Sequence, residues 1–367
     1  MTHPFRAAAL AAGALFALPP AFVQAHDTDP TAPHALDHAP IGVMADHRHG
    51  AGEFMLSYRF MTMDMDGNRQ GTDPISPEAI ATTVPNRLAG QPMQPPTLRV
   101  VPTDMRMDMH MVGAMYGLSD RITLMAMGSY LDNSMNHLTF AGPTGPTVRG
   151  GFETGSRGFG DTTLSAIVGL DDGSHKSRQV NLVLGLSVPT GSNTQTDQVL
   201  APTGMTPTLR LPYPMQLGSS TWDAKPAISY LDRNGRFGWG GQLSARVPLE
   251  RNAKGYRFGS RGEATAWVAY EPAPWISGSL RMKGATQGRI NGEDPVLRAP
   301  VQTTDPRNQG GETLDLLFGV NLAAQTGALR GHRLGAELGL PLHRDLNGVQ
   351  LETDMTLTLG WQYAFGG

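Results

Sequence analysis

Residues 349–365 of the chain read VQLETDMTLTLGWQYAF, and this stretch decides the fold. Every second residue from Leu351 onward is apolar except Thr353, whereas the residues between them are polar or small. Because successive side chains on a β-strand point to opposite faces, one face is apolar along its whole length and the other is polar. The apolar face ends in three aromatic residues: Trp361, Tyr363 and Phe365. This pattern is typical of a membrane-spanning β-strand, which is apolar toward lipid and carries aromatic residues at the water interface.

The first 25 residues have the features of a signal peptide. Arg6 supplies a positive start, residues 7–18 form a short apolar core, and residues 23–25 (VQA) end in a small-residue cleavage site. The apolar core is too short for a transmembrane helix, and no later stretch offers about 18 consecutive apolar residues. We therefore expect export through a cleaved signal peptide to the bacterial outer membrane.

The composition excludes several classes of protein. Gly and Pro number 45 and 28, which favours many turns over a helical fold. Lys and Arg number 29 against 32 Asp and Glu, so the charge balance predicts no nucleic-acid partner. The chain has 0 cysteines, which excludes a disulfide framework and a thiolate metal site.

We expect residues 26–52, which are rich in His, Asp and Pro, to form a flexible periplasmic leader. The alternation of residues 349–365 recurs through residues 53–367, which we expect to form one all-β, closed antiparallel transmembrane β-barrel. The expected strands cover residues 53–65, 104–118, 121–131, 162–170, 179–188, 220–231, 237–249, 259–270, 275–285, 313–323, 332–342 and 349–365.

Short and long connections alternate between these twelve segments. An even number of strands, with short periplasmic turns at one end and long extracellular loops at the other, is the plan of outer-membrane barrels. The long connections include a Pro-rich segment, residues 66–103, and a Gly-rich loop before residue 162. A β-propeller or β-sandwich also has regularly spaced strands. However, the sequence has no fixed-period repeat, and its strict alternation in strand after strand favours the barrel.

Four stretches carry a family resemblance: VPTG at residues 188–191, YGLSDRITL from Tyr116, GFGDTTL from Gly158 and GSSTWDAKPAISY from Gly218. With them the chain resembles the outer-membrane barrels labelled as transporters of the MetA pathway of phenol degradation. The resemblance covers most of the chain after the signal peptide and implies passage of small molecules across the outer membrane. The chain departs from the usual barrel ending, because Gly366 and Gly367 follow its last aromatic residue.

Methionine is concentrated in one part of the chain, with 14 of 19 residues between Met44 and Met135. On the expected strands most of them fall on the face opposite the lipid, so they would line the lumen and its outer rim. Thioethers are soft ligands that select Cu(I), although methionine also fills irregular space because it is flexible. The methionines predicted as metal ligands are Met61, Met63, Met65, Met105, Met107, Met109, Met111, Met125 and Met127.

The expected leader contains five of the 11 histidines. His47 and His49 flank Arg48, with Asp46 beside them, and imidazole suits Cu(II) or Zn(II). The alternative is a solvated tail whose histidines bind nothing tightly. We expect no required cofactor, and copper is the favoured ion if this chain binds a metal.

Charged residues of both signs share the face expected to line the lumen. Either they pair across a largely filled barrel or they line a polar conduit for a small solute. They are Arg59, Asp223, Lys225, Arg246, Glu263, Arg281, Lys283, Asp315, Arg333, Glu337, Glu352 and Asp354.

The sequence therefore predicts an outer-membrane channel or transporter for a small solute, in contact with membrane lipid. The alternative is an outer-membrane protein that binds or helps to export a soft metal, with copper favoured. We expect no enzymatic activity and name no catalytic or cofactor-binding residue. A nucleophilic serine needs an oriented histidine beside it. None of the histidines expected in the barrel has such a serine: His110, His137, His175, His332 and His343.

Overall fold

The computed structural model of the chain describes residues 33–171 and 177–366, which belong to one compact unit. The predicted signal peptide and residues 26–32 lie outside the described residues. Among the residues that the structure describes, no helix is long and apolar enough to cross a bilayer.

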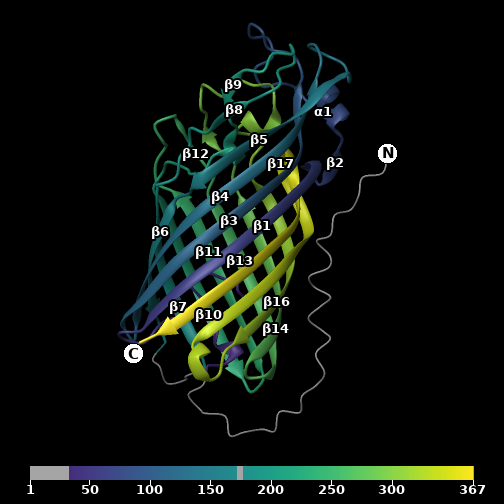
Figure 1. Cartoon of the computed structure of the whole chain (residues 1–367). Coiled ribbons are helices and arrows are strands. Elements are labelled where there is room, and N and C mark those ends of the chain that lie inside the picture. The colour runs from purple at the N-terminus through teal and green to yellow at the C-terminus, as the bar shows by residue number, and fades with distance from the viewer. Residues whose placement is uncertain (1–32, 172–176, 367) are drawn as a thin grey trace. The chain divides into compact units, whose positions relative to one another are not determined.

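The unit is a closed antiparallel β-barrel (Figure 1). Eleven strands pair in chain order around the wall, and the last strand pairs with the first to close it. They are β1 (Phe54–Gly71), β3 (Val100–Ser119), β4 (Ile122–Phe140), β6 (Thr162–Gly169), β7 (Gln179–Val188), β10 (Asp223–Asn234), β11 (Phe237–Pro248), β13 (Arg261–Ala273), β14 (Ile276–Gln287), β16 (Gly311–Ala323) and β17 (His332–Phe365).

Strand β17 crosses the wall twice, because its first part pairs with β16 and its second part pairs with β1. The chain reverses at Asn347-Gly348, where Gly348 has a φ of 69°, and this is the left-handed conformation that favours glycine in tight hairpin turns. The two halves also contact each other, since Trp361 Nε1 lies 3.0 Å from His332 Nδ1. Eleven strands with one counted twice give twelve passes, so the predicted fold class and the twelve predicted segments are confirmed.

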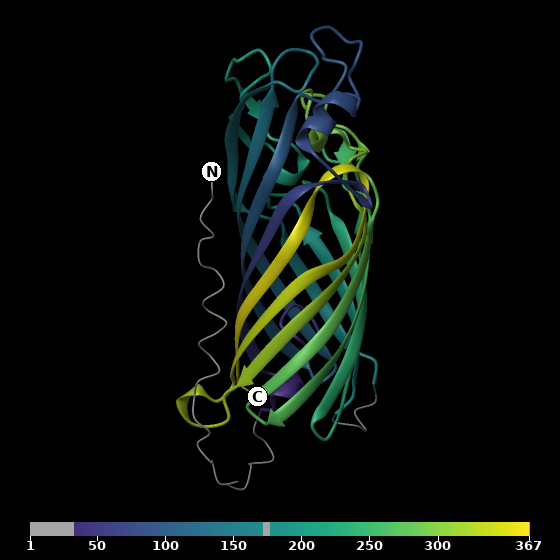
Figure 2. The same ribbon diagram turned by 90° about the vertical axis from the view of Figure 1, so that its right-hand side faces the viewer.

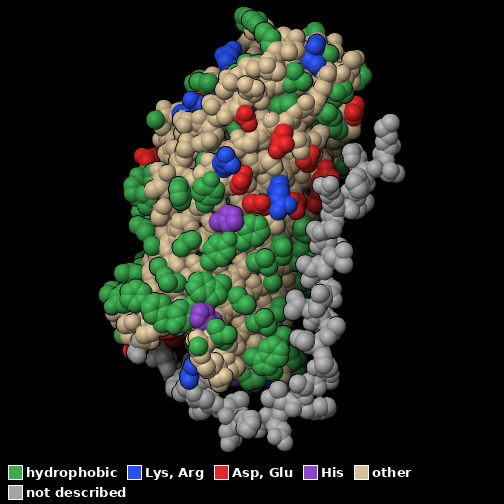
Figure 3. Space-filling model, viewed as in Figure 1, with side chains coloured by type: hydrophobic (Ala, Val, Ile, Leu, Met, Phe, Trp, Pro, Cys, Tyr) green, Lys and Arg blue, Asp and Glu red, His purple; other side chains and the backbone are tan. Residues whose placement is uncertain are grey.

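The two faces of each strand meet different surroundings, as the alternation predicted. In β7 the side chain of Leu184 is 56% exposed, whereas that of its neighbour Val183 is 4% exposed. Exposed apolar side chains gather over the lower part of the face in Figure 3, and most charged side chains on this face lie above them. Such a band is what a lipid-facing surface requires.

Aromatic rings cluster where the last strand meets the first, close to the end of the barrel that carries the short turns. The ring centroids of Phe54 and Tyr116 are 4.6 Å apart, and those of Tyr363 and Phe365 are 5.2 Å apart. The predicted aromatic end of residues 349–365 therefore forms part of an aromatic girdle.

The opposite end, which we call the loop end, carries more regular structure than the sequence predicted (Figure 2). The expected Gly-rich loop before residue 162 is largely a strand, β5 (Val148–Phe159), which extends the sheet beside β4. The Pro-rich segment contains a short helix, α1 (Pro77–Thr83), capped by the side chain of Ser76. The other short elements at this end are β2 (Asp73–Ile75), β8 (Thr196–Gln198), β9 (Thr208–Arg210), β12 (Tyr256–Arg257), β15 (Asn291–Gly292), η3 (Tyr213–Met215) and η4 (Gln302–Thr304).

The expectation of a flexible leader is wrong for residues 33–52, which fold into the barrel and which we call the plug. Ala35, Ile41 and Val43 are 0%, 1% and 3% exposed, and they pack among residues of the wall. The physical reason is that small and β-branched apolar residues alternate here too, so that the segment buries one face against the wall.

Candidate functional site

One part of the plug is held by β14, β16, β17 and the turn between β13 and β14. The backbone N–H of Ala35 donates to the carbonyl of Pro274 (2.9 Å), and that of Gly42 donates to Glu337 (3.1 Å). Arg333 donates to the carbonyl of Ala39 and, at 2.8 Å, to the side chain of Asn321. These bonds satisfy plug backbone groups that would otherwise be buried without partners.

The other part of the plug is held by β4, β7, β11 and the turn after β6. Asn181 donates to the carbonyl of Asp46, and Gln242 donates to that of Met44. The guanidinium of Arg48 binds both carboxylate oxygens of Asp171, at 2.7 and 3.0 Å. The hydrogen bond from Arg48 lowers the pKa of Asp171 to about 2. The plug therefore bridges opposite sides of the lumen.

Glycines in the wall make room for the plug. A Cβ atom on Gly335 would lie 2.7 Å from Ile41, and one on Gly360 would lie 2.5 Å from the same side chain. A Cβ atom on Gly169 would overlap the guanidinium of Arg48. The fit of Ile41 thus depends on wall positions that have no side chain.

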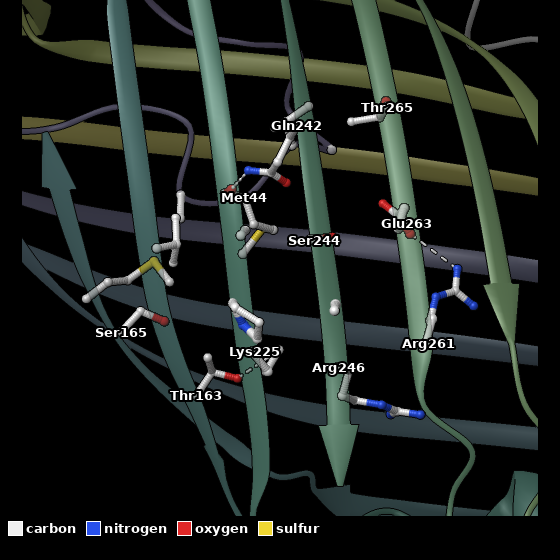
Figure 4. Close-up of a pocket in the computed structure, with 18 of the residues that line it drawn as sticks. Met44, Thr163, Ser165, Lys225, Gln242, Ser244, Arg246, Arg261, Glu263 and Thr265 are labelled. Carbon is white, nitrogen blue, oxygen red and sulfur yellow. Dashed lines mark hydrogen bonds and ion pairs between the residues drawn. The ribbon is translucent and has the colours of Figure 1, made fainter. Parts of the chain in front are cut away.

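A cavity of about 310 Å³ lies in the lumen beside plug residues Gly42 to Ala45 (Figure 4). Lys225 projects into it from β10 and donates to Thr163 at 3.1 Å. The rest of its charged lining consists of Arg246, Arg261, Glu263 and Arg281. The cavity therefore combines apolar walls with charged groups, and cations outnumber anions among its charged side chains.

Most of the predicted lumen charges form ion pairs. Arg281 and Glu337 make a buried two-point pair at 2.7 and 2.8 Å. Asp315 lies 3.2 Å from Lys283 and 2.6 Å from Arg344. The remaining pairs are Asp223 with Arg246 (3.9 Å), Glu263 with Arg261 (3.3 Å) and Glu352 with Arg69 (2.6 Å).

Four of the predicted lumen charges are not in these pairs: Lys225 and Arg333, whose hydrogen bonds are described above, and Arg59 and Asp354. Arg59 is 6% exposed, and its guanidinium contacts the sulfur of Met44 in the plug. Asp354 is exposed, because the register of β17 against β1 shifts between Met355 and Thr353. Such a bulge adds one residue and breaks the alternation that placed Asp354 in the lumen.

The predicted methionines meet in register on three neighbouring strands. On β1 and β3, Met61 pairs with Met109, Met63 with Met107 and Met65 with Met105, while Met111 lies opposite Arg59. On β4, Met125 pairs with Met115, and Met127 pairs with Gly113. The thioethers therefore form a continuous strip on one side of the lumen.

Both ends of this strip are packed against apolar residues. At the loop end, Met65, Met105 and Met107 pack with Met135 and Met215 in one apolar cluster. At the plug, Met125 packs with Met55, Met115 and Ala45. Many of the predicted methionines therefore fill apolar space. This is the alternative to metal binding, and it follows from the flexible side chain of methionine.

Three histidines of the plug lie close together. The Nδ1 atoms of His38 and His47 are 3.3 Å apart, and His47 Nδ1 is 2.9 Å from Asp46 Oδ1. The rings of His47 and His49 have centroids 4.9 Å apart, and His49 Nδ1 lies 3.3 Å from Glu53. The sequence therefore identified two members of this cluster, His47 and His49.

Burial lowers the pKa of His38, and the neighbouring His47 lowers it further. Burial also lowers the pKa of His49. Burial opposes the ionised form of Asp46, but His47, His38 and Arg333 together outweigh it and lower the pKa of this carboxyl. The lowered pKa values of His38 and His49 favour their neutral, metal-binding form beside an ionised carboxylate.

A larger cavity, of about 980 Å³, lies among the extracellular-type loops at the loop end. Its lining is mainly apolar and includes Met93, Leu209 and Leu297. Arg149 and Arg298 add cationic groups to the lining. This arrangement suits a small solute with an apolar body and a polar or anionic group.

Comparison with known proteins shows the fold. An outer membrane channel from Pseudomonas putida F1 is similar in structure, with a TM-score of 0.52 and 14% identity over 87% of this chain and 98% of that chain. The β domain of the Bordetella autotransporter Brka has a TM-score of 0.45 and 11% identity over 86% of this chain and 100% of that chain. No family model matches the chain, and no curated protein matches its sequence. The chain has an outer-membrane β-barrel fold, and its resemblance to the phenol-degradation family stays a prediction.

Sequence reasoning missed the plug and with it His38, Ile41 and the anchor Arg48. A signal was present, because Ala39, Ile41, Val43 and Ala45 occupy every second position, as the inward or outward residues of a strand do. This alternating run is short, and charged residues and histidines follow it. The prediction of a flexible leader therefore relied on the His, Asp and Pro content of the whole segment.

Proposed function

We propose that the protein is an outer-membrane channel for a small amphipathic solute, closed in this structure by its plug. The observation that carries the proposal is the arrangement inside the wall. A cavity of about 980 Å³ lies among the loops, a cavity of about 310 Å³ with five charged side chains in its lining lies in the lumen, and the plug lies beside the second cavity.

The plug is suited to a gate because its contacts are non-covalent. Hydrogen bonds and ion pairs hold it to the wall, and it contributes no strand to the barrel ladder. The plug can therefore leave the lumen while the hydrogen bonds between the wall strands stay intact. A change that opens a pore requires an intact wall of this kind.

The test is ion conductance in planar bilayers, comparing the full mature chain with a variant that lacks residues 34–48. We expect a small current from the former and larger, stepwise currents from the latter. Heat-modifiable migration on gels checks that both barrels are folded. A folded, plug-deleted barrel with no added conductance would contradict the proposal.

The strip of methionines favours a second candidate function, passage of a soft metal ion such as Cu(I). In-register thioethers offer successive weak sites along one wall, as a path for such an ion needs. Its test is titration with Cu(I) or Ag(I) before and after Met61, Met63, Met107 and Met109 are replaced by Leu. Unchanged affinity would remove this candidate.

A further inference from the structure

His38, Asp46 and His47 bring three metal-ligating groups together inside the lumen. One ligand atom from each lies within 4.8 Å of the others. Asp46 and His47 are 3% and 4% exposed. Such a group is unlike the exposed acidic clusters of ordinary surfaces, because burying it without a partner ion leaves polar atoms to be satisfied.

An unpartnered nitrogen beside this group points to a missing ligand. The Nε2 atom of His49 is buried and makes no hydrogen bond. Because His49 Nδ1 faces Glu53, donation to this carboxylate would leave Nε2 as a bare acceptor. A carboxylate that orients an imidazole in this way is the usual outer partner of a metal-binding histidine.

The spacing of the ligand atoms indicates the geometry. Two nitrogens bound to one tetrahedral ion at about 2.0–2.1 Å lie roughly 3.3–3.4 Å apart. The Nδ1 atoms of His38 and His47 are 3.3 Å apart. Neighbouring ligands of a square-planar Cu(II) ion would lie roughly 2.8–2.9 Å apart, as His47 Nδ1 and Asp46 Oδ1 do at 2.9 Å. The spacing of the two nitrogens therefore favours zinc, and titration with both ions decides between them.

The backbone holds the group in place before any ion arrives. The backbone N–H of Ala39 donates to Asp46 Oδ2 at 2.9 Å, which ties residue 38 to residues 46 and 47. The carbonyl of Asp46 is fixed in turn by Asn181 of β7. Such support keeps a small metal site close to its binding geometry.

We propose that His38, Asp46 and His47 bind one zinc(II) ion in the lumen, with His49 as the nearest further imidazole. The ion would join the two limbs of the plug, residues 38 and 46–47, and so hold the plug in its folded form. Zinc binding at this site is independent of solute passage. It can be measured without any current through the barrel.

The test is zinc titration of the purified, EDTA-treated full mature chain, with zinc alone as the probe and a chromogenic chelator as competitor. We expect one equivalent of zinc. Loss of an outer partner of a metal ligand costs about 10–100-fold in affinity, so His47→Gln and His38→Gln, which each remove a ligand, should lose at least about 100-fold. His34→Gln is the matched control, because His34 lies in the same plug but binds Glu271, and it should bind zinc as the parent does.

Cobalt(II) gives a second readout, because a tetrahedral site produces intense visible absorption that a surface complex does not. The proposal would be overturned by binding well below one equivalent, by equal losses in His34→Gln and His47→Gln, or by binding of Cu(II) without zinc. Normal gel migration of each variant separates loss of the site from loss of the barrel. If the plug-deleted barrel shows no added conductance, the proposed channel function is contradicted. The outcome of the zinc titration is unaffected.

Discussion

Arg48 shows how a single side chain ties the plug to the wall. Its guanidinium lies in the space that Gly169 leaves open and binds Asp171 at two points. Such charged hydrogen bonds contribute about 1.5–3 kcal/mol each. The pair is therefore one of several polar contacts that attach the plug to the wall.

This pair should respond to acid in a defined range. A carboxyl whose pKa is lowered stabilises the folded arrangement above its ordinary pKa of about 3.9, and the stabilisation is lost as the pH falls toward the lowered value. The pKa of Asp171 is lowered to about 2. We therefore expect a spin label at Ala51→Cys, in a chain with 0 native cysteines, to become mobile between pH 4 and pH 2.

The control for this experiment is Asp171→Asn. We expect its label to be mobile already at neutral pH, with the plug released roughly tenfold more often because a charged hydrogen bond is lost. A variant that keeps the same acid transition would show that another group controls the plug.

The hairpin formed by β17 is the element that receives the plug, because Gly335 and Gly360 on its two halves face Ile41. Gly360→Leu should fill this space, and overpacking of this kind costs about 1–3 kcal/mol. Since the plug is the mobile partner, we expect the variant to raise bilayer conductance by roughly tenfold.

Gly278→Leu is the matched control, because a Cβ atom on Gly278 meets nothing within 4 Å and the residue is exposed. Its conductance should equal that of the parent chain. If Gly360→Leu has the same conductance as the parent chain, then Ile41 packs elsewhere in the lumen and the plug stays in place.

The strands were predictable because alternation is a local property of the sequence. β7 has the predicted bounds, 179–188, and the short turn after Ser119 leads directly into β4. β5 was missed because glycines at 150, 151, 155 and 158 weaken its pattern. Asp354 was misplaced because a single bulge reverses the order of the two faces.

At the scale of the whole molecule, the lumen has a predictable electrostatic character. The cavity is lined by four cations, Lys225, Arg246, Arg261 and Arg281. Three of them pair with the carboxylates of Asp223, Glu263 and Glu337, so four cations minus three anions leave +1. An excess of one sign of charge concentrates ions of the opposite sign. The plug-deleted barrel should therefore prefer anions.

Reversal potentials in a potassium chloride gradient measure this preference. Lys225→Glu should shift the potential toward cation selectivity, since it changes the lining charge by two units. Arg106→Glu, on the exposed side of β3, should leave the potential unchanged. Cation preference in the plug-deleted parent would show that charges outside this cavity control passage.

Contacts between residues far apart in sequence could not be predicted from local patterns. The plug is placed by Arg333, Asn181 and Glu337, which lie between 135 and 295 positions from their partners. The cavity and the metal-ligating cluster exist only because of that placement. Alternation therefore identifies the wall, whereas the contents of the lumen depend on tertiary contacts.

The plug also has a consequence for biogenesis. Its first and last residues lie at the same mouth, near the turn at Pro274 and near Gly117 of β3. It is thus a bent loop inserted from one side, and nothing has to be threaded through the cylinder. Insertion machinery can complete the seam between β1 and β17 first, and the loop can then enter from the periplasm as a late, reversible step.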